Sequence, residues 1–568
     1  MALLVCALVT KPYAEMGIND DWSYIRSAQV LAQTGHLAYN GWATAMLGWQ
    51  IYLGALMVKL FGFSFSILRL TELLIGMATS FLLQRTFVRT GLREWNATVA
   101  TLAIVLSPLF LPLAVSFMTD VSGVFAIVLC LYACIRALQA ETTGGASGWI
   151  AFAAISNGIS GNVRQIAWLG VLVMVPSTLW LLRRHRRVLI TGLLSGLCGV
   201  GIIVATLHWY NRQPYSLPEP LLQEAINKHE VLRLFHYVRL SFLELGFLLV
   251  PVLLIFVPAM RFRSRRAILA VGVVVGLFLL SAIFMQHRGH ALAAPPFLGN
   301  ILTIHGGFDT STIQGNQPVY LRGWERLALS TAEITGVCCF AVTLLGWMRS
   351  RKLVSAETTV LPWRELLVLL VPFTVCYFAL LFPRATYSLL FDRYMLPLMM
   401  VAVCLMTRFY QDCLELRLPF ITLVLVLLFS AYGIMATHDT FAMYRARVAV
   451  IDELRGSGVP AVAIDGGWEY GTWVQTIETG HVNDRRIRVP ANAYVPLPIE
   501  SERPCHPMRS DMTPQMSPRF ALSFDPNICA GGAPFAPVTY HTWLSPHSAT
   551  IYVVRYNNRE SRLSPALP

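Results

Sequence analysis

The sequence predicts an α-helical polytopic membrane protein that ends in a small soluble α/β region. Of its 568 residues, 55% are hydrophobic and only 13% are charged, and the mean hydropathy is +0.56. A soluble globular protein carries roughly 25% charged residues. Apolar runs of spanning length recur along the chain, and short clusters of arginine separate them. This distribution explains the formal charge of +13 by membrane topology, and it argues against nucleic-acid binding.

The chain begins with a short apolar segment and a long loop. Leu3 to Val9 is shorter than the roughly 20 residues of a spanning helix, so we expect a first helix that is truncated or extended by its flanks. In the loop, residues 11–66, apolar residues recur at helical spacing over Ile25–Leu37 and Gly48–Phe63. We expect both segments to lie along the membrane surface. The alternative, a transmembrane helix over 45–62, would invert every later loop and break the charge rule.

Twelve further apolar stretches approach or reach spanning length, and with the N-terminal segment they predict about thirteen helices. The weakest is 147–161, because it is short and carries Ser156, Asn157 and Gly158. The stretches cover about 67–89, 96–115, 119–139, 147–161, 164–182, 188–208, 240–260, 266–286, 328–348, 364–382, 392–410 and 417–437.

The basic residues fall in alternate loops. With the N-terminus in the cytoplasm, every strongly basic loop is cytoplasmic, as the positive-inside rule requires. The strongest clusters are Arg183–Arg187, Arg261–Arg266 and Arg349–Lys352. The acidic positions and the C-terminal tail then share the opposite face. We therefore expect an integral protein of a bacterial inner (plasma) membrane, with its polar site and its tail extracytoplasmic.

From about residue 438 the chain becomes polar and rich in proline and glycine. This change predicts a transmembrane domain over 1–437 and a soluble region over 438–568. In the soluble region, Ala442–Arg455 has the pattern of a helix and Ala461–Asp465 that of a strand. The eleven cysteines show no metal-ligand spacing, but Cys505 and Cys529 stand alone in this region. An oxidising compartment favours a disulfide between them, and the alternative is two free thiols.

Carboxylates stand at the edges of apolar stretches, where they are costly unless they face water or one another. Asp20 and Asp21 precede the first surface helix, and Thr119 and Asp120 open a long apolar stretch. Because aspartate favours the N-cap position, capping is the structural alternative for each. Their shared face instead favours one polar site above a helical bundle, suited to an enzyme with a lipid-borne substrate.

Two arginines stand on the same predicted face, against the charge rule. Arg164 is either a snorkelling side chain or a phosphate ligand, since a guanidinium can donate two hydrogen bonds to phosphate. Arg393 resembles it, with pairing to the adjacent Asp392 as its alternative. A third basic group, at the outer end of a helix, is either a substrate contact or merely interfacial, and consists of His287, Arg288 and His290.

A series of short motifs follows a fixed order along about residues 15–475. The motifs are Asn19–Tyr24 with Thr34-Gly35, Leu60–Gly62 with Leu68–Leu70, Ser116–Asp120, Arg164-Gln165, Asp392–Pro397 and Gly466–Tyr470. Taken in order, they resemble the GT-C glycosyltransferases, in the glycosyltransferase family 39-like branch of protein O-mannosyltransferases and the bacterial aminoarabinose transferase of lipid A. The resemblance departs where Gly41–Leu47 lacks a Pro-Pro-Leu segment and a nearby lysine, and where Asp21 replaces the more common Glu.

The resemblance implies a GT-C fold and a transferase that moves a sugar, with inversion, from a polyprenyl-phosphate donor to a lipid, glycan or protein hydroxyl. The departing phosphate needs positive charge, expected from Arg164 first and Arg393 second. The acceptor hydroxyl needs a general base, either Asp20 or Asp21, while Asp120 orients the acceptor or shares that role. No cofactor is implied with certainty, and a divalent metal stays open because relatives differ. Substrate contacts are expected from Trp22, Tyr24, Trp42, His287, Arg288, Asp392 and Tyr394.

A membrane transporter or a lipid or oligosaccharide flippase is the alternative, because charges inside a membrane protein often mark a translocation path. A transporter would place ionisable residues near mid-membrane and often shows inverted repeats. Here the acidic residues stand at the edges of the apolar stretches and no repeat is visible. A non-catalytic scaffold would leave the carboxylates of the outer face unexplained, so the transferase is the preferred interpretation.

Overall fold

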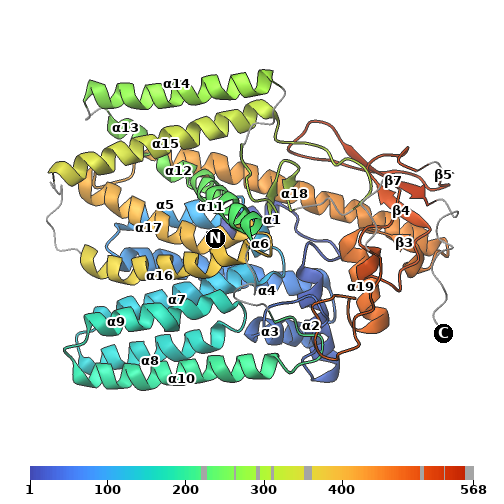
Figure 1. The fold of residues 1–568 in the computed structure, drawn as a ribbon, viewed down its shortest axis with the longest axis horizontal. Helices are drawn as coiled ribbons and strands as arrows, with labels where there is room; N and C mark the ends of the chain where they lie inside the picture. Colours follow the sequence, from blue (N-terminus) through green and yellow to red (C-terminus); the bar gives the residue numbers. More distant parts are fainter. Residues whose placement is uncertain are drawn as a thin grey trace.

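The protein is a bundle of helices with a group of short strands at one end, on the right in Figure 1. The computed structural model describes residues 1–218, 227–260, 264–288, 294–308, 313–350, 361–498, 505–529 and 531–556. Within these ranges eight helices are long and apolar enough to cross a membrane, or nine when one bent pair counts as a single span. The prediction of a mostly helical polytopic membrane protein is confirmed.

Every apolar stretch predicted from the sequence falls on helical structure. The helices that qualify as spans are α4 (Phe65–Arg89), α7 (Thr119–Leu138), α10 (Arg186–Tyr210), α14 (Arg265–His287), α15 (Gly323–Ser350), α16 (Trp363–Arg384), α17 (Leu396–Cys413) with the 3₁₀ turn η4 (Asp392–Met395), and α18 (Phe420–Gly456). The bent pair is α11 (Lys228–Leu248) and the segment Val250–Ala259, which holds α12 (Val250–Leu253) and α13 (Phe256–Ala259).

Several predicted spans are shorter or broken, so the count of thirteen stays a prediction. α5 (Glu94–Val105) ends just before Pro108, which cannot continue the helix ladder, and α6 (Phe110–Ala114) follows it. The stretch 164–182 divides into η1 (Gln165–Trp168), the π turn η2 (Gly170–Met174) and α9 (Val175–Leu181). The side chain of Asn157, on α8 (Thr143–Ser160), accepts a hydrogen bond from Val171 N at 2.8 Å and thereby stabilises this break.

Two short helices form the segment between α1 (Ala2–Val9) and α4. They are α2 (Asp21–Thr34), which ends at Gly35 in the left-handed conformation, and α3 (Trp49–Phe61). At 13 residues α3 is about 20 Å long, too short to cross a membrane, and residues 45–48 lie outside it. The surface-helix prediction therefore fits these lengths better than a span over 45–62.

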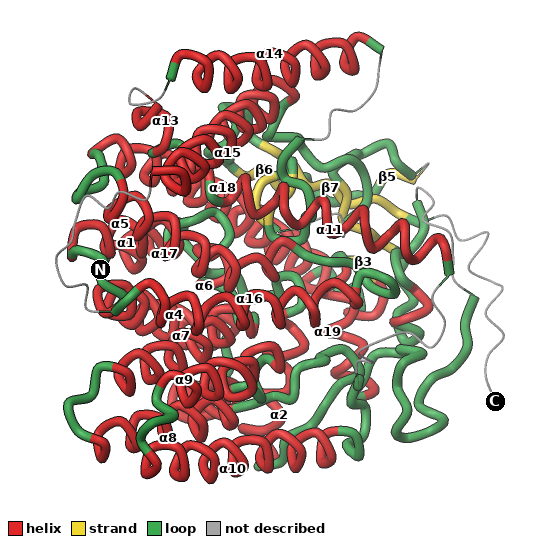
Figure 2. The backbone as a smooth tube through the Cα atoms, turned by 60° about the vertical axis from the view of Figure 1, so that its left-hand side comes forward, coloured by secondary structure: helices red, strands yellow, loops and turns green. Residues whose placement is uncertain are grey.

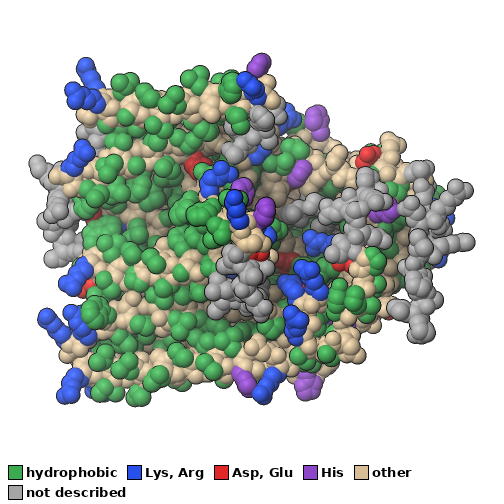
Figure 3. All heavy atoms as spheres, in the orientation of Figure 1, with side chains coloured by type: hydrophobic (Ala, Val, Ile, Leu, Met, Phe, Trp, Pro, Cys, Tyr) green, Lys and Arg blue, Asp and Glu red, His purple; other side chains and the backbone are tan. Residues whose placement is uncertain are grey.

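Clusters of basic residues stand at one end of several helices, and the candidate aspartates stand at the other. α4 and α7 end in a turn that carries Arg89 and Arg136, and in Figure 3 Lys and Arg side chains gather at the left-hand ends of the helices. Hydrophobic side chains cover the helices between the two ends. Asp120 and Asp392 lie instead in the first turns of α7 and η4. These two candidate residues thus share the end that faces the strands. Parts of the predicted basic clusters, residues 261–263 and 351–352, and the predicted contact His290 lie outside the described residues.

The C-terminal region is tied to the bundle by α18, which runs without a break through the predicted boundary at 437/438. Of the predicted strand only Ile464-Asp465 forms, after a 3₁₀ turn over Ala461–Ala463. The helix α19 (Trp468–Thr479) follows. In the sheet order β3-β4-β7-β5, β3 and β4 are parallel and the other pairs antiparallel, while β6 pairs with β7. The strands are β1 (Leu302–Thr303), β2 (Gly306–Gly307), β3 (Ile464–Asp465), β4 (Phe520–Ser523), β5 (Gly531–Gly532), β6 (Val538–Tyr540) and β7 (Ala549–Arg555).

The predicted disulfide is present. Cys505 and Cys529 are joined at an S–S distance of 2.01 Å, and they pack with the buried residues Ala521 and Val554 of the sheet. The alternative of two free thiols is therefore wrong for this structure.

Candidate active site

Asp20 is held between the bundle and the loop that follows α2. Its Oδ2 lies 3.1 Å from Nη2 of Arg393, which is 373 residues further along the chain, and its Oδ1 accepts a hydrogen bond from Nε1 of Trp42 at 2.9 Å. Asp20 occupies the N-cap of α2, but its side chain accepts no hydrogen bond from the helix backbone. Capping therefore does not explain this carboxylate, which remains 21% exposed.

Asp120 forms a second ion pair with Arg164. Their Oδ1 and Nη1 atoms are 2.9 Å apart, and Arg164 also donates to Oγ1 of Thr119 at 3.2 Å. Asp120 is 2% exposed, yet neither of its oxygens accepts a well-directed hydrogen bond from the described residues. Arg164 thus points at a carboxylate rather than snorkelling towards the surface.

The ring of Tyr394 joins the two ion pairs. The guanidinium carbons of Arg164, Arg384 and Arg393 lie 5.3, 5.4 and 5.9 Å from its centroid, within cation–π range. The carbonyl oxygen of Tyr394 accepts a hydrogen bond from the Tyr377 hydroxyl at 2.8 Å, which fixes the backbone of η4. We call Asp20, Asp120, Arg164, Arg393, Tyr24 and Tyr394 the charged cluster.

The side chain of Tyr24 lies close enough to Asp20, Asp120, Arg164 and Arg393 for their charges to affect its pKa. Burial, followed by the negative charge of Asp20, raises the pKa of Tyr24 to about 12. The phenol is therefore neutral at physiological pH, so it can donate or accept a hydrogen bond but cannot serve as a base.

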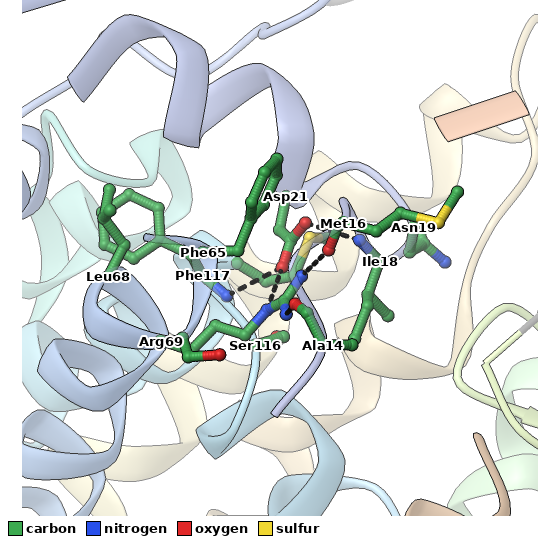
Figure 4. Close-up of polar contacts among 12 residues, drawn as sticks. Ala14, Met16, Ile18, Asn19, Asp21, Phe65, Leu68, Arg69, Ser116 and Phe117 are labelled. Atoms are coloured by element: carbon green, nitrogen blue, oxygen red, sulfur yellow. Dashed lines mark hydrogen bonds and ion pairs between the residues drawn. The ribbon is translucent and has the colours of Figure 1, made fainter. Parts of the chain in front are cut away.

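Asp21 has a different environment from its neighbour Asp20. It is fully buried, its Oδ2 lies 2.9 Å from Nε of Arg69, and it accepts backbone hydrogen bonds from Ile18 at 2.7 Å and Phe117 at 3.4 Å. Figure 4 shows the guanidinium of Arg69 between this carboxylate and the carbonyl oxygens of Ala14 and Met16. In this structure the carboxylate of Asp21 is enclosed and committed to Arg69 and to backbone donors, whereas that of Asp20 is partly exposed.

Asp392 is also buried and structural. Its oxygens accept hydrogen bonds from the backbone nitrogens of Ile301 at 3.0 Å, Leu302 at 2.6 Å and Arg393 at 2.7 Å. It therefore fixes β1 against η4, and the side chain of Arg393 turns to Asp20 instead of pairing with Asp392.

The predicted aromatic residues form a cluster with the C-terminal region. The ring of Trp42 lies 6.1 Å from that of Trp22 and 5.1 Å from that of Trp468 at the start of α19. Trp22 is fully buried and serves packing. Trp42 is half-buried and carries the hydrogen bond to Asp20, so the C-terminal region supports the carboxylate through this ring.

His287 and Arg288 are not brought to the charged cluster. Both are exposed at the end of α14, which lies at the edge of the bundle in Figures 1 and 2. The guanidinium of Arg288 lies over the ring of Phe284, 4.9 Å from its centroid, on the same helix. The interfacial alternative explains their positions.

Sequence reasoning missed Arg384 and Tyr377, which reach the cluster from α16. Arg384 follows an apolar stretch, where an arginine commonly marks a helix end, so the sequence carries no signal for it. No three His, Cys, Asp or Glu side chains come together as metal ligands in the described ranges. The carboxylates of the cluster are instead paired with arginines, and we assign no step to a metal.

Comparisons with known proteins find distant structural similarity. No family model and no curated protein matches the sequence. ArnT from Cupriavidus metallidurans in the apo state is similar with a TM-score of 0.35 and 13% identity, over 80% of this chain and 79% of that chain. The form bound to undecaprenyl phosphate has a TM-score of 0.33 and 13% identity, with 80% of each chain covered.

An archaeal oligosaccharyltransferase, AglB from Archaeoglobus fulgidus, in complex with an inhibitory peptide and a dolichol-phosphate, has a TM-score of 0.36 and 13% identity. The similarity covers 81% of this chain and 59% of that chain. These proteins are GT-C glycosyltransferases, the class that the sequence motifs resemble. With TM-scores this low, none of them assigns a role to a residue of this chain.

Proposed function

We propose that the protein is a membrane glycosyltransferase that moves a sugar from a polyprenyl-phosphate donor to a lipid, glycan or protein hydroxyl on the extracytoplasmic face. The observation that carries this proposal is the charged cluster. It holds two ion pairs, one of them with a partly exposed carboxylate, at the end of the bundle opposite the basic helix ends. A lipid phosphate at headgroup depth would meet this cluster while its hydrocarbon tail stays among the helices.

The arginines suit the departing phosphate. In Arg393 the Nε and Nη1 atoms are buried without a hydrogen-bond partner among the described residues, a costly arrangement that a phosphate oxygen would relieve. Arg164 already donates to Thr119 and contacts Asp120. We therefore propose Arg393 as the principal phosphate ligand, with Arg164 as the second positive charge that stabilises the leaving group.

The carboxylates suit the acceptor. Asp20 is the most exposed of the three predicted aspartates, so it is the one that can reach an acceptor hydroxyl and take its proton. When a phosphate engages Arg393, the guanidinium is shared between the phosphate and Asp20, and the carboxylate is less tightly paired. Attack from the side opposite the phosphate would invert the anomeric centre. Asp120 holds Arg164 and orients the acceptor.

Transfer by the purified protein tests this proposal directly. Labelled polyprenyl-phosphate sugars are supplied in detergent with a membrane extract as acceptor. Asp20→Asn should lower the transfer rate by about 10²-fold or more, because it removes the base. The matched control is Asp452→Asn, which alters an exposed aspartate on α18 and should leave transfer unchanged.

The role of the two arginines can be distinguished from that of the base by measuring how the transfer rate depends on donor concentration. Arg393→Gln and Arg164→Gln should raise the donor concentration needed for half-maximal rate. The corresponding lysine variants should recover only part of the loss, because an ammonium lacks the planar pair of N–H donors. Transfer that survives Asp20→Asn at full rate, with unchanged donor dependence in both arginine variants, would contradict the roles of these residues. Absence of transfer by the unaltered protein would refute the proposed function.

A further inference from the structure

A second polar site involves α2, the helix that also carries Tyr24 of the charged cluster. It is a pocket of about 270 Å³ that opens between α2, the segment after α2, the loop after α10 and the C-cap of α19. This volume has room for about nine water molecules at liquid density, comparable to one sugar ring. The residues that carry the argument are Arg26, Tyr39, Asn40, Gln213 and Tyr215.

Arg26 is the charged group of this pocket. It is half-buried, donates to Oε1 of Gln29 at 2.7 Å, and lies over the ring of Trp473, 5.9 Å from its centroid. No carboxylate of the described residues is within ion-pair distance of it, whereas the buried Arg69 and Arg447 each pair with a carboxylate at 2.9 Å. One guanidinium with spare N–H groups therefore faces a cavity without a counter-ion, which favours an anion there.

The walls of the pocket are fixed by hydrogen bonds of their own. The Tyr39 hydroxyl donates to the carbonyl oxygen of Met46 at 2.8 Å, and Asn40 exchanges two hydrogen bonds of 2.8 Å with Ser23. The ring of Tyr215 stacks on that of His481 with centroids 4.3 Å apart. Such a wall offers aromatic faces and backbone acceptors in a preformed arrangement, as sugar-sized ligands require.

The wall of the pocket is joined to the turn of α2 that follows the base. Asn40 lines the pocket and exchanges two hydrogen bonds with Ser23, which lies three residues after Asp20, in the first turn of α2. Arg26 stands six residues after Asp20, less than two turns further along the same helix. This proximity favours the acceptor, which must reach the base, over the donor as the occupant of the pocket.

We propose that this pocket binds a sugar-sized polar moiety carrying one anionic group, a carboxylate or a phosphate, with Arg26 as its ligand. The assignment of that moiety to the acceptor rests on the proposed function, whereas its binding does not. Arg26 is a binding residue that sets acceptor specificity and takes no part in proton transfer.

Ligand-observed saturation-transfer NMR on the full-length protein in detergent tests the proposal, with glucose, glucuronate and glucose 6-phosphate as probes. We expect at least one anionic probe to bind and glucose to bind about tenfold or more weakly. Arg26→Gln should abolish that preference and Arg26→Lys should retain part of it. Arg212→Gln removes an exposed charge one residue before the pocket-lining Gln213 and is the matched control, expected to match the unaltered protein.

The two anionic probes identify the source of the charge, since carboxylate and phosphate are presented on the same ring. Any of three results would refute the proposed binding site. They are equal signals from glucose and both anions, no binding of any probe, or an anion preference that persists in Arg26→Gln. Because this assay needs no donor, Arg26-dependent binding without sugar transfer would retain the pocket and refute only the proposed function.

Discussion

Asp20 and Asp21 are neighbours in the chain, but their side chains leave the start of α2 in different directions. Asp21 faces Arg69 in the protein interior and Asp20 faces Arg393 at the end of the bundle. Removing one partner of a buried ion pair leaves an uncompensated charge, at a cost of about 3–5 kcal/mol. Asp21→Asn should therefore lower the thermal unfolding midpoint in detergent strongly, whereas Asp20→Asn, in a partly exposed pair, should lower it less and change mainly the activity.

A double variant distinguishes a structural pair from a catalytic carboxylate. Asp21→Leu combined with Arg69→Met removes both charges and should recover part of the lost stability, since apolar replacements of a buried pair are often tolerated. If Asp21→Asn folds as stably as the unaltered protein and loses transfer, Asp21 belongs to the mechanism after all.

Part of the candidate site could be predicted residue by residue. Asp20, Asp120, Arg164 and Arg393 stand out in the sequence because a charge beside an apolar stretch requires a partner. Which of two adjacent aspartates is buried could not be predicted, since that depends on the position of Arg69. Residues that contact the charged cluster from a helix end, such as Arg384, carry no distinguishing signal.

At the scale of elements, the start of α4 depends on an acidic residue far from it in sequence. Glu15 accepts hydrogen bonds from the hydroxyls of Ser64 and Ser66 and from the backbone nitrogen of Phe65, at 2.7–2.9 Å. Burial raises the pKa of Glu15, but hydrogen bonds from Ser66, Ser64 and the backbone lower it below the ordinary 4.5. The ionised carboxylate therefore stabilises the folded state above pH 4.5, and this contribution disappears as the pH falls through the lowered pKa.

Glu15→Gln should lower the stability by about 1 kcal/mol at pH 7, the scale of a helix cap. The difference from the unaltered protein should fade as the pH falls below 4.5. Chemical unfolding in detergent at pH 7 and pH 4 measures both, with the exposed Glu453→Gln as control. A difference that is the same at both pH values would show that the charge of Glu15 plays no part.

The apolar helices could be predicted because long runs of hydrophobic residues are visible in the sequence, but the breaks within these helices could not be predicted. The break over 165–174 is stabilised by Asn157, a contact between two elements that no single stretch reveals. The continuity of α18 was also not predicted, because its C-terminal half is polar and resembles a separate region, although it continues the same helix.

At the scale of the whole molecule, α10 provides a test of topology. Its 25 residues extend about 37 Å, long enough to cross a bilayer, with the exposed Arg184 before it and the exposed Arg212 after it. We expect a membrane-impermeant maleimide to label Arg212→Cys in intact spheroplasts and Arg184→Cys only after permeabilisation. The unaltered protein reports the background of its native cysteines. Labelling of both variants from the same side would contradict the membrane arrangement.

The contact between Asp20 and Arg393 has a consequence for biogenesis. Asp20 is translated and delivered to the membrane long before Arg393 is translated. Trp468, which packs on the ring of Trp42 that donates to Asp20, follows later still. Throughout that interval the nascent chain carries the carboxylate without its counter-ion. The charged cluster is consequently completed only when the last membrane segment and the tail have been delivered.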